Sequence, residues 1–83
     1  MKILDIKEVK IGAVYVVRHR NKGEFIIVVT KKNEEIVHGK ILMGEAITNF
    51  IERTVIKKKG EVVGFNPSFA RMKEVEGVDV SVL

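Results

Sequence analysis

The sequence predicts an all-β fold, mainly antiparallel, in which residues 1–83 form a single small β-barrel domain of five to six short strands. The first observation is that residues 13–43 contain three apolar, β-branched runs joined by two short polar breaks. Val, Ile, Tyr, Phe and Thr suit a pleated, half-buried surface, so such runs are typical of strands. The second is Gly23, which ends the first break where a three-residue hairpin loop needs a left-handed residue. We therefore expect a three-stranded antiparallel meander at the centre of the fold.

The alternation of side chains along these runs predicts which residues face the core. A loop at residues 21–23 pairs Arg20 with Glu24 and directs one set of side chains inward: Tyr15, Val17, His19, Phe25, Ile27 and Val29. A second loop at residues 32–34 adds three inward-facing residues: Val37, Gly39 and Ile41. A shift of one residue would instead bury His38 and Lys40, at a cost of about 2–7 kcal/mol for an unpaired polar group and more for a charge. We therefore expect both of these side chains to point outward.

Residues 44–53 allow two interpretations. Their apolar residues recur at helical spacing, which favours a short helix near 45–53 that caps one end of the barrel. So short a helix depends on packing rather than on helix propensity, and an irregular loop is the alternative. At the start of the chain, residues 1–11 have no clear period, and we expect a lead-in segment that covers one barrel end.

The remaining runs predict the later strands. Residues 54–57 and 61–65 flank a Lys-Lys-Gly break with the form of the first hairpin loop, so we expect them to pair, with Lys57 opposite Glu61. Residues 69–75 follow a tight turn at Pro67 and form the last main strand. Residues 78–82 alternate strictly and predict an additional edge strand.

The short strands, the three-residue hairpin loops and the tight turn before the last main strand resemble a small Src-homology-3-like (SH3-like) barrel. Within that class, the stretch Val-Lys-Ile-Gly-Ala-Val-Tyr-Val-Val at residues 9–17, followed by Lys22, Gly23 and Val28, resembles the KOW motif. That motif occurs in ribosomal proteins and transcription elongation factors. The resemblance implies contact with RNA or with protein.

Composition limits the class of protein. The chain contains no cysteine, which excludes disulfides and thiolate metal sites and leads us to expect a cytoplasmic location. No run has the roughly 18–20 apolar residues of a membrane span, and we expect no secretion signal and no membrane partner. Lys and Glu are abundant whereas Gln and Trp are missing, a composition that hints at a thermophilic source. The net charge of +4 and the pI near 9.5 favour polyanionic partners such as nucleic acid.

Catalytic patterns are missing from the sequence. No hydroxyl lies in a nucleophile motif, the carboxylates alternate with lysines as on a solvated face, and the glycines are dispersed. The histidines His19 and His38 point to opposite faces in the expected register, which argues against a metal site. We expect a protein that is not an enzyme, with no catalytic residues, metal or cofactor.

The strongest functional signal is the distribution of basic residues, which face outward in the expected register or lie in a hairpin loop. The candidate nucleic-acid-binding residues are Arg18, Arg20, Lys22, His38, Lys40, Lys57, Lys58, Lys59, Arg71 and Lys73. Such a face gains affinity for phosphates by releasing counterions. We expect Tyr15, Phe25 and Phe65 in the core, so the sequence predicts phosphate contact without base stacking.

The alternative function is a protein-interaction or self-assembly module. The exposed apolar residues would form a mixed apolar and basic patch between the charges, as in many interfaces: Val16, Ile26, Val28 and Ile36. The C-terminal edge strand at 78–83 could also pair with the sheet of a protein partner or of a second copy of the chain.

Overall fold

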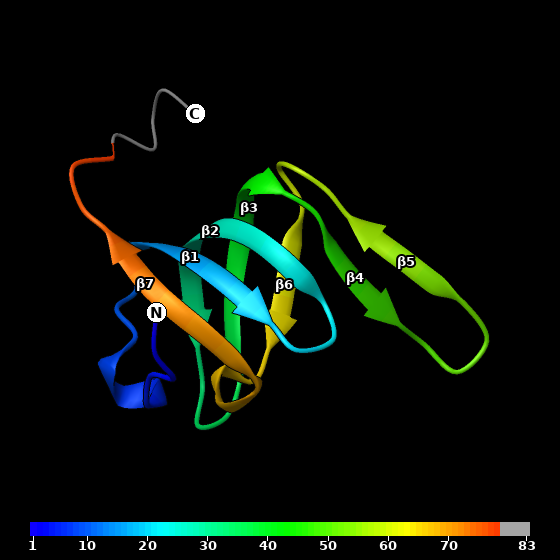
Figure 1. Ribbon diagram of the computed structural model, residues 1–83, viewed down its shortest axis with the longest axis horizontal. Coiled ribbons are helices and arrows are strands. Elements are labelled where there is room, and N and C mark those ends of the chain that lie inside the picture. The colour runs from blue at the N-terminus through cyan, green and yellow to red at the C-terminus, as the bar shows by residue number, and fades with distance from the viewer. Residues whose placement is uncertain (79–83) are drawn as a thin grey trace.

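The computed structural model describes residues 1–78, which form seven strands in two antiparallel sheets and two single-turn 3₁₀ helices (Figure 1). The elements are η1 (Ile6–Glu8), β1 (Val14–His19), β2 (Gly23–Lys32), β3 (Val37–Gly44), β4 (Ala46–Asn49), β5 (Thr54–Lys57), β6 (Val62–Phe65), η2 (Pro67–Phe69) and β7 (Ala70–Val75). This confirms the all-β, mainly antiparallel prediction, but the described residues form seven strands and not five to six, because residues 46–49 add one. The predicted edge strand at 78–82 lies outside the described residues except for Val78.

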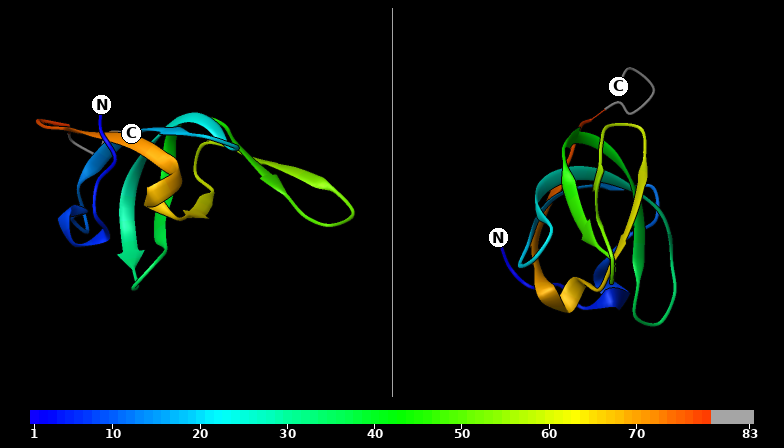
Figure 2. Two further views of the ribbon diagram at one scale, coloured as in Figure 1. Left: turned by 60° about the horizontal axis from the view of Figure 1, so that its bottom comes forward. Right: turned by 90° about the vertical axis from the view of Figure 1, so that its right-hand side faces the viewer.

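The larger sheet has the strand order β6-β3-β2-β1-β7, and it bends strongly without closing into a barrel (Figure 2). The expectation of a closed barrel is therefore wrong. The two edge strands β6 and β7 follow each other in the chain, but η2 joins them and they do not pair side by side. None of the helices in residues 1–78 is long and apolar enough to cross a membrane.

The first hairpin differs from the expected register by two residues. Its loop is residues 20–22, with His19 opposite Gly23 and Val17 opposite Phe25. Gly23 has φ +90°, as expected for the left-handed residue of the turn. Because side chains alternate with a period of two, a shift of two residues leaves every side chain on its predicted face. Tyr15, Val17, His19, Phe25, Ile27 and Val29 are all buried, which confirms the inward set.

The second hairpin shows the same kind of difference. Ile27 lies opposite Ile41 and Val29 opposite Gly39, two residues away from the expected pairs, and the ladder is irregular on both sides of this stretch. Gly39 is required there because a Cβ atom would lie only 2.6 Å from Cδ1 of Ile27. Ile41 is fully buried and Lys40 is exposed, so the predicted faces of β3 are confirmed.

Residues 44–57 correct two predictions. They form no helix near 45–53 and no irregular loop: β4 and β5 make a hairpin of their own, with Ile47 opposite Ile56, that projects from the larger sheet (Figure 2). The expected pairing of 54–57 with 61–65, including Lys57 opposite Glu61, is also wrong, because Lys57 lies opposite Ala46 in β4. The strand β6 pairs instead with β3, and this pairing buries its two inward side chains, Val63 and Phe65.

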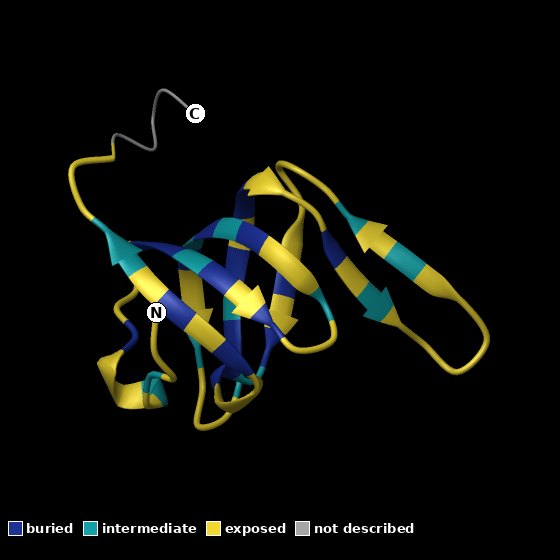
Figure 3. Cartoon of the chain, viewed as in Figure 1, coloured by how far each residue is buried: buried dark blue, intermediate teal, exposed yellow. Residues whose placement is uncertain are grey.

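The core lies on the concave side of the bent sheet. Its members come from five strands of the larger sheet, from β4 and from the N-terminal segment: Val9, Tyr15, Val17, Phe25, Ile27, Val29, Val37, Ile41, Ala46, Val63, Phe65, Ala70 and Met72. Leu4 and Ile6 pack against this core, which confirms that the lead-in covers one end of the sheet. Exposed and buried residues alternate along β7, with Ala70 and Met72 inward (Figure 3).

Candidate nucleic-acid interface

Eight of the ten predicted basic residues fall into two groups, which lie toward opposite sides of the larger sheet. One group comes from β1, the turn after it and β7: Arg18, Arg20, Arg71 and Lys73. We call this group the β1–β7 basic cluster. The other comes from β3 and from the end of β5 with the turn that follows: Lys40, Lys57, Lys58 and Lys59. Lys22 lies half-buried in the first turn.

Within the β1–β7 basic cluster, Arg18 and Arg71 occupy directly paired positions on neighbouring strands. Both residues are exposed, and Lys73 follows two residues further along the same face of β7. The Nε of Arg18 donates to a carboxylate oxygen of Glu24 at 3.1 Å, but Arg71 makes no ion pair with any of residues 1–78. Like charges opposite each other destabilise a sheet, and arginine cannot lose its proton to relieve the repulsion. The cluster therefore holds positive charge that an external anion would compensate.

An exposed aromatic ring lies beside this cluster, which the sequence did not lead us to expect. Phe69, at the end of η2, exposes 49% of its surface, and the Cζ of Arg20 lies 5.9 Å from the centroid of its ring. Phe25, Phe65 and Tyr15 are buried as predicted. The signal that could have located Phe69 is the Asn-Pro-Ser stretch before it, because Asn as cap and Pro at the first position are typical of a helical turn.

An open depression of about 400 Å³ lies between the arginines of the β1–β7 basic cluster and Phe69. Its lining includes Arg18, His19, Arg20, Phe69 and Arg71. Burial lowers the pKa of His19 below its ordinary value of 6.5, and the charges of Lys22 and Arg20 lower it further. The neutral ring uses Nδ1 to accept hydrogen bonds from the backbone N–H groups of Asn21 at 3.0 Å and Lys22 at 3.2 Å. The positive charge of the depression therefore comes from the arginines.

The second basic group has a different setting. Lys40 lies on the outward face between Val28 and Val62, as predicted, but His38 is half-buried against Gly64. A Cβ atom on Gly64 would lie 3.2 Å from the His38 ring, and the buried Nδ1 of His38 has no hydrogen-bond partner among the described residues. Half-buried Val16, Ile26 and Val28, with exposed Met43, separate Lys40 from Arg18 across this face. Arg18 and Lys40 thus point outward as predicted, but the positive charges of the two basic groups do not form one continuous patch.

The lysines Lys57, Lys58 and Lys59 lead into the turn before β6. The N–H of Lys58 donates to Oε1 of Glu61 at 3.0 Å, and the N–H of Gly60 donates to the carbonyl oxygen of Ile41 at 2.8 Å. The turn is thus fixed beside Ile41 in the middle of β3, on the side of the sheet opposite β7.

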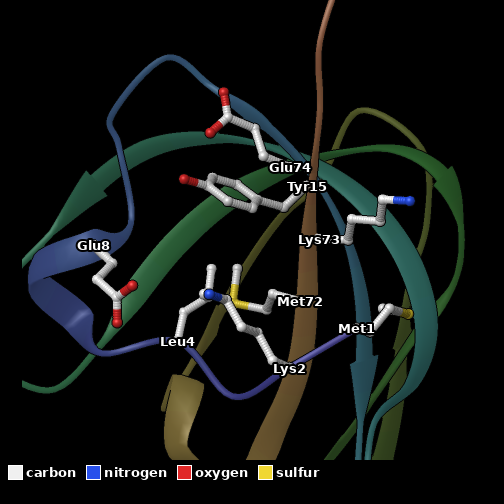
Figure 4. A pocket seen from close by; sticks show the side chains of 8 residues that line it. All are labelled: Met1, Lys2, Leu4, Glu8, Tyr15, Met72, Lys73 and Glu74. Atoms are coloured by element: carbon white, nitrogen blue, oxygen red, sulfur yellow. The ribbon is translucent and has the colours of Figure 1, made fainter.

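A larger depression, of about 500 Å³, lies between the N-terminal segment and β7 (Figure 4). It contains Tyr15, Glu8 and Glu74, but each of these groups has a structural partner. The Tyr15 hydroxyl accepts the N–H of Lys10 at 2.9 Å, Glu8 accepts the N–H of Asp5 at 3.1 Å, and Glu74 pairs with the Lys10 ammonium at 3.3 Å. Among residues 1–78, no three His, Asp or Glu side chains converge as metal ligands would.

A scan against models of protein families matched none of them, and searches of curated proteins and of solved structures found no match to this chain. Only the residues of this chain and their arrangement therefore indicate its function.

Proposed function

We propose that this chain is a non-enzymatic module that binds RNA or DNA, mainly by phosphate contacts at the β1–β7 basic cluster. The observation that carries the proposal is the direct pairing of Arg18 with Arg71 on exposed positions of neighbouring strands. Guanidinium groups suit phosphate because they donate two parallel hydrogen bonds to one anion. Because Glu24 already pairs with Nε of Arg18, a phosphate between the two arginines would mainly compensate the charge of Arg71.

Four further features support this proposal. The net charge of +4 favours approach to a polyanion, and Arg71 has no carboxylate partner among residues 1–78. The three-residue loop between β1 and β2 and the tight turn at η2 just before β7 are two of the features on which the resemblance to SH3-like domains rests. The KOW resemblance of residues 9–17 implies contact with RNA or with protein, and RNA is the ligand that it shares with this proposal.

A salt titration of binding tests the proposal. The affinity for a labelled oligonucleotide of about 16 nucleotides is measured by fluorescence anisotropy between about 50 and 200 mM salt. We expect log K to fall linearly with log salt concentration, because each phosphate contact releases counterions. Binding that does not respond to salt, or no binding at about 50 mM salt, would contradict the proposal.

A second candidate function is protein interaction through the β4–β5 hairpin. Four large apolar residues are exposed on it: Ile47 at 41%, Phe50 at 53%, Ile51 at 104% and Ile56 at 46%. Figure 3 shows that the hairpin is mostly exposed. Clustered apolar residues at the surface are typical of interaction sites. The partner in this candidate function is another protein or a second copy of the chain.

Sedimentation of the wild type and of an F50S/I51S variant tests this second function for self-assembly. If the hairpin joins copies of the chain, the wild type sediments as an oligomer at high concentration and the variant as a monomer. A wild-type chain that remains a monomer excludes self-assembly through the hairpin.

A further inference from the structure

We infer that the β1–β7 basic cluster takes single-stranded nucleic acid, with one unpaired base stacked on the ring of Phe69. This inference rests on the proposed function and specifies its ligand. It combines three observations made at one place: an exposed aromatic ring, a guanidinium group against that ring, and further arginines in the same depression.

The ring of Phe69 is held in a defined position. The N–H of Phe69 donates to the carbonyl oxygen of Asn66 at 3.1 Å, and its own carbonyl oxygen accepts the N–H of Arg20 at 2.9 Å. The ring also packs at an angle of 75° to the ring of buried His19, with the two ring centroids 6.5 Å apart. A base that stacks on this ring therefore meets a platform whose backbone is already ordered, which lowers the entropic cost of binding.

The charges beside the ring lie where the backbone of a stacked nucleotide would run. Arg18, Arg20 and Arg71 line the same depression of about 400 Å³ as Phe69, a volume within the range of sites for small ligands. Single-strand-binding proteins combine these two elements, a basic groove for the backbone and aromatic rings for the bases. The arginines alone would suit any polyanion, and the ring is the feature that selects an unpaired base.

The chain offers a matched control for the ring. Phe50 is exposed to a similar extent, 53%, and Arg53 lies over it with Cζ 5.6 Å from the ring centroid. This second pair lies in the tip of the β4–β5 hairpin, away from the β1–β7 basic cluster, and has Glu52 beside it. If exposure of an aromatic–arginine pair were sufficient, Phe50 and Phe69 would contribute equally to binding.

The experiment compares wild type, F69A, F69Y and F50A in binding to a single strand and to a duplex of equal length. We expect F69A to weaken single-strand binding about 5- to 150-fold, the range found for loss of one stacked base. Duplex binding and the slope of log K against log salt should stay unchanged, because no phosphate contact is removed. F69Y, which keeps the ring, should bind within a few-fold of wild type, and F50A should match wild type.

A fluorescent base analogue in the single strand gives a direct readout of stacking, because its emission changes when it stacks on a ring. We expect this change with wild type and F69Y but not with F69A. If F69A and F50A weaken binding equally, or if F69A affects single strand and duplex alike, the stacking inference is overturned while nucleic-acid binding stands. If wild type binds neither ligand, the proposed function itself fails. Thermal unfolding of each variant confirms that the compared proteins are folded.

Discussion

The ammonium group of Lys32, on β2, donates a hydrogen bond of 2.6 Å to the carbonyl oxygen of Val9. The same group also lies 2.9 Å from the carbonyl oxygen of Ile6 and 3.5 Å from that of Lys7. An ammonium group has three N–H donors, so the single side chain of Lys32 can donate to all three carbonyl groups, two within η1 and one just after it. This contact ties the N-terminal segment to the larger sheet.

Replacement of Lys32 by Met should therefore lower the free energy of unfolding by about 1–3 kcal/mol, because the carbonyl groups lose a charged donor in a partly buried place. The neighbouring exposed Lys31 is the control, and K31M should change stability by less than about 0.5 kcal/mol. Urea unfolding measures both variants. Equal effects of K32M and K31M would show that the contact contributes nothing.

Removal of Arg71 should weaken nucleic-acid binding and reduce the slope of log K against log salt by about one, since one phosphate contact is lost. The control is K59A, which removes one positive charge at the opposite edge of the sheet. We expect it to leave the slope unchanged. If both variants weaken binding equally, affinity follows net charge rather than the β1–β7 basic cluster.

The R71A variant should also be at least as stable as wild type, because the repulsion between Arg18 and Arg71 is removed. This second measurement separates a binding defect from a folding defect. A variant that unfolds more readily would show that Arg71 has a structural role.

Stability should depend on pH through His19. Because burial lowers the pKa of His19 in the folded protein, the unfolded chain takes up the proton first as the pH falls. The contribution of His19 to the free energy of unfolding is fully present above its pKa in the unfolded chain, about 6.5. This contribution is lost as the pH falls from there to the lowered pKa of the folded protein. Urea unfolding near pH 7.5 and near pH 5.5 should therefore show a larger loss for wild type than for H19F. A His19 pKa at or above 6.5 in an NMR titration would contradict this prediction.

Substitution of Gly39 by Ala should lower the free energy of unfolding by about 1–3 kcal/mol through overpacking. The new methyl group would lie 2.6 Å from Cδ1 and 2.8 Å from Cβ of Ile27, so the strands would have to move apart. The double variant G39A/I27V removes one of these contacts, and its loss should be smaller than the sum of the single losses. Additive losses would indicate that the two sites do not interact.

The faces of the central strands could be predicted from the sequence, but their pairs could not. Alternation placed Val17, Phe25 and Ile41 inward whichever even shift the hairpins adopted. The actual loop at residues 20–22 depends on His19, whose ring accepts two backbone N–H groups of the turn. Such a contact between a side chain and a nearby backbone has no periodic signal.

The β4–β5 hairpin was missed because its apolar residues imitate a helix. Ala46, Ile47, Phe50 and Ile51 have helical spacing, but Phe50 and Ile51 lie in the loop after β4, where they have no strand neighbour. The sequence predicted the basic residues of the candidate site but not their grouping, for a different reason. Each arginine was recognised, but their grouping depends on the pairing of β1 with β7 and on the position of Phe69 in η2.

The pairing of β1 with β7 joins the first strand of the chain to the last described one. The hairpins of the meander can form early, because their strands are neighbours in the sequence. The pairing of β1 with β7 must first close a loop that contains most of the chain, and this closure costs conformational entropy before any contact forms. During synthesis, before residues 70–75 have left the ribosome, β1 would therefore be an edge strand of the sheet. Arg18 would then lack Arg71 as its neighbour. We therefore expect completion of the sheet and assembly of the arginine pair to occur in the same late step of folding.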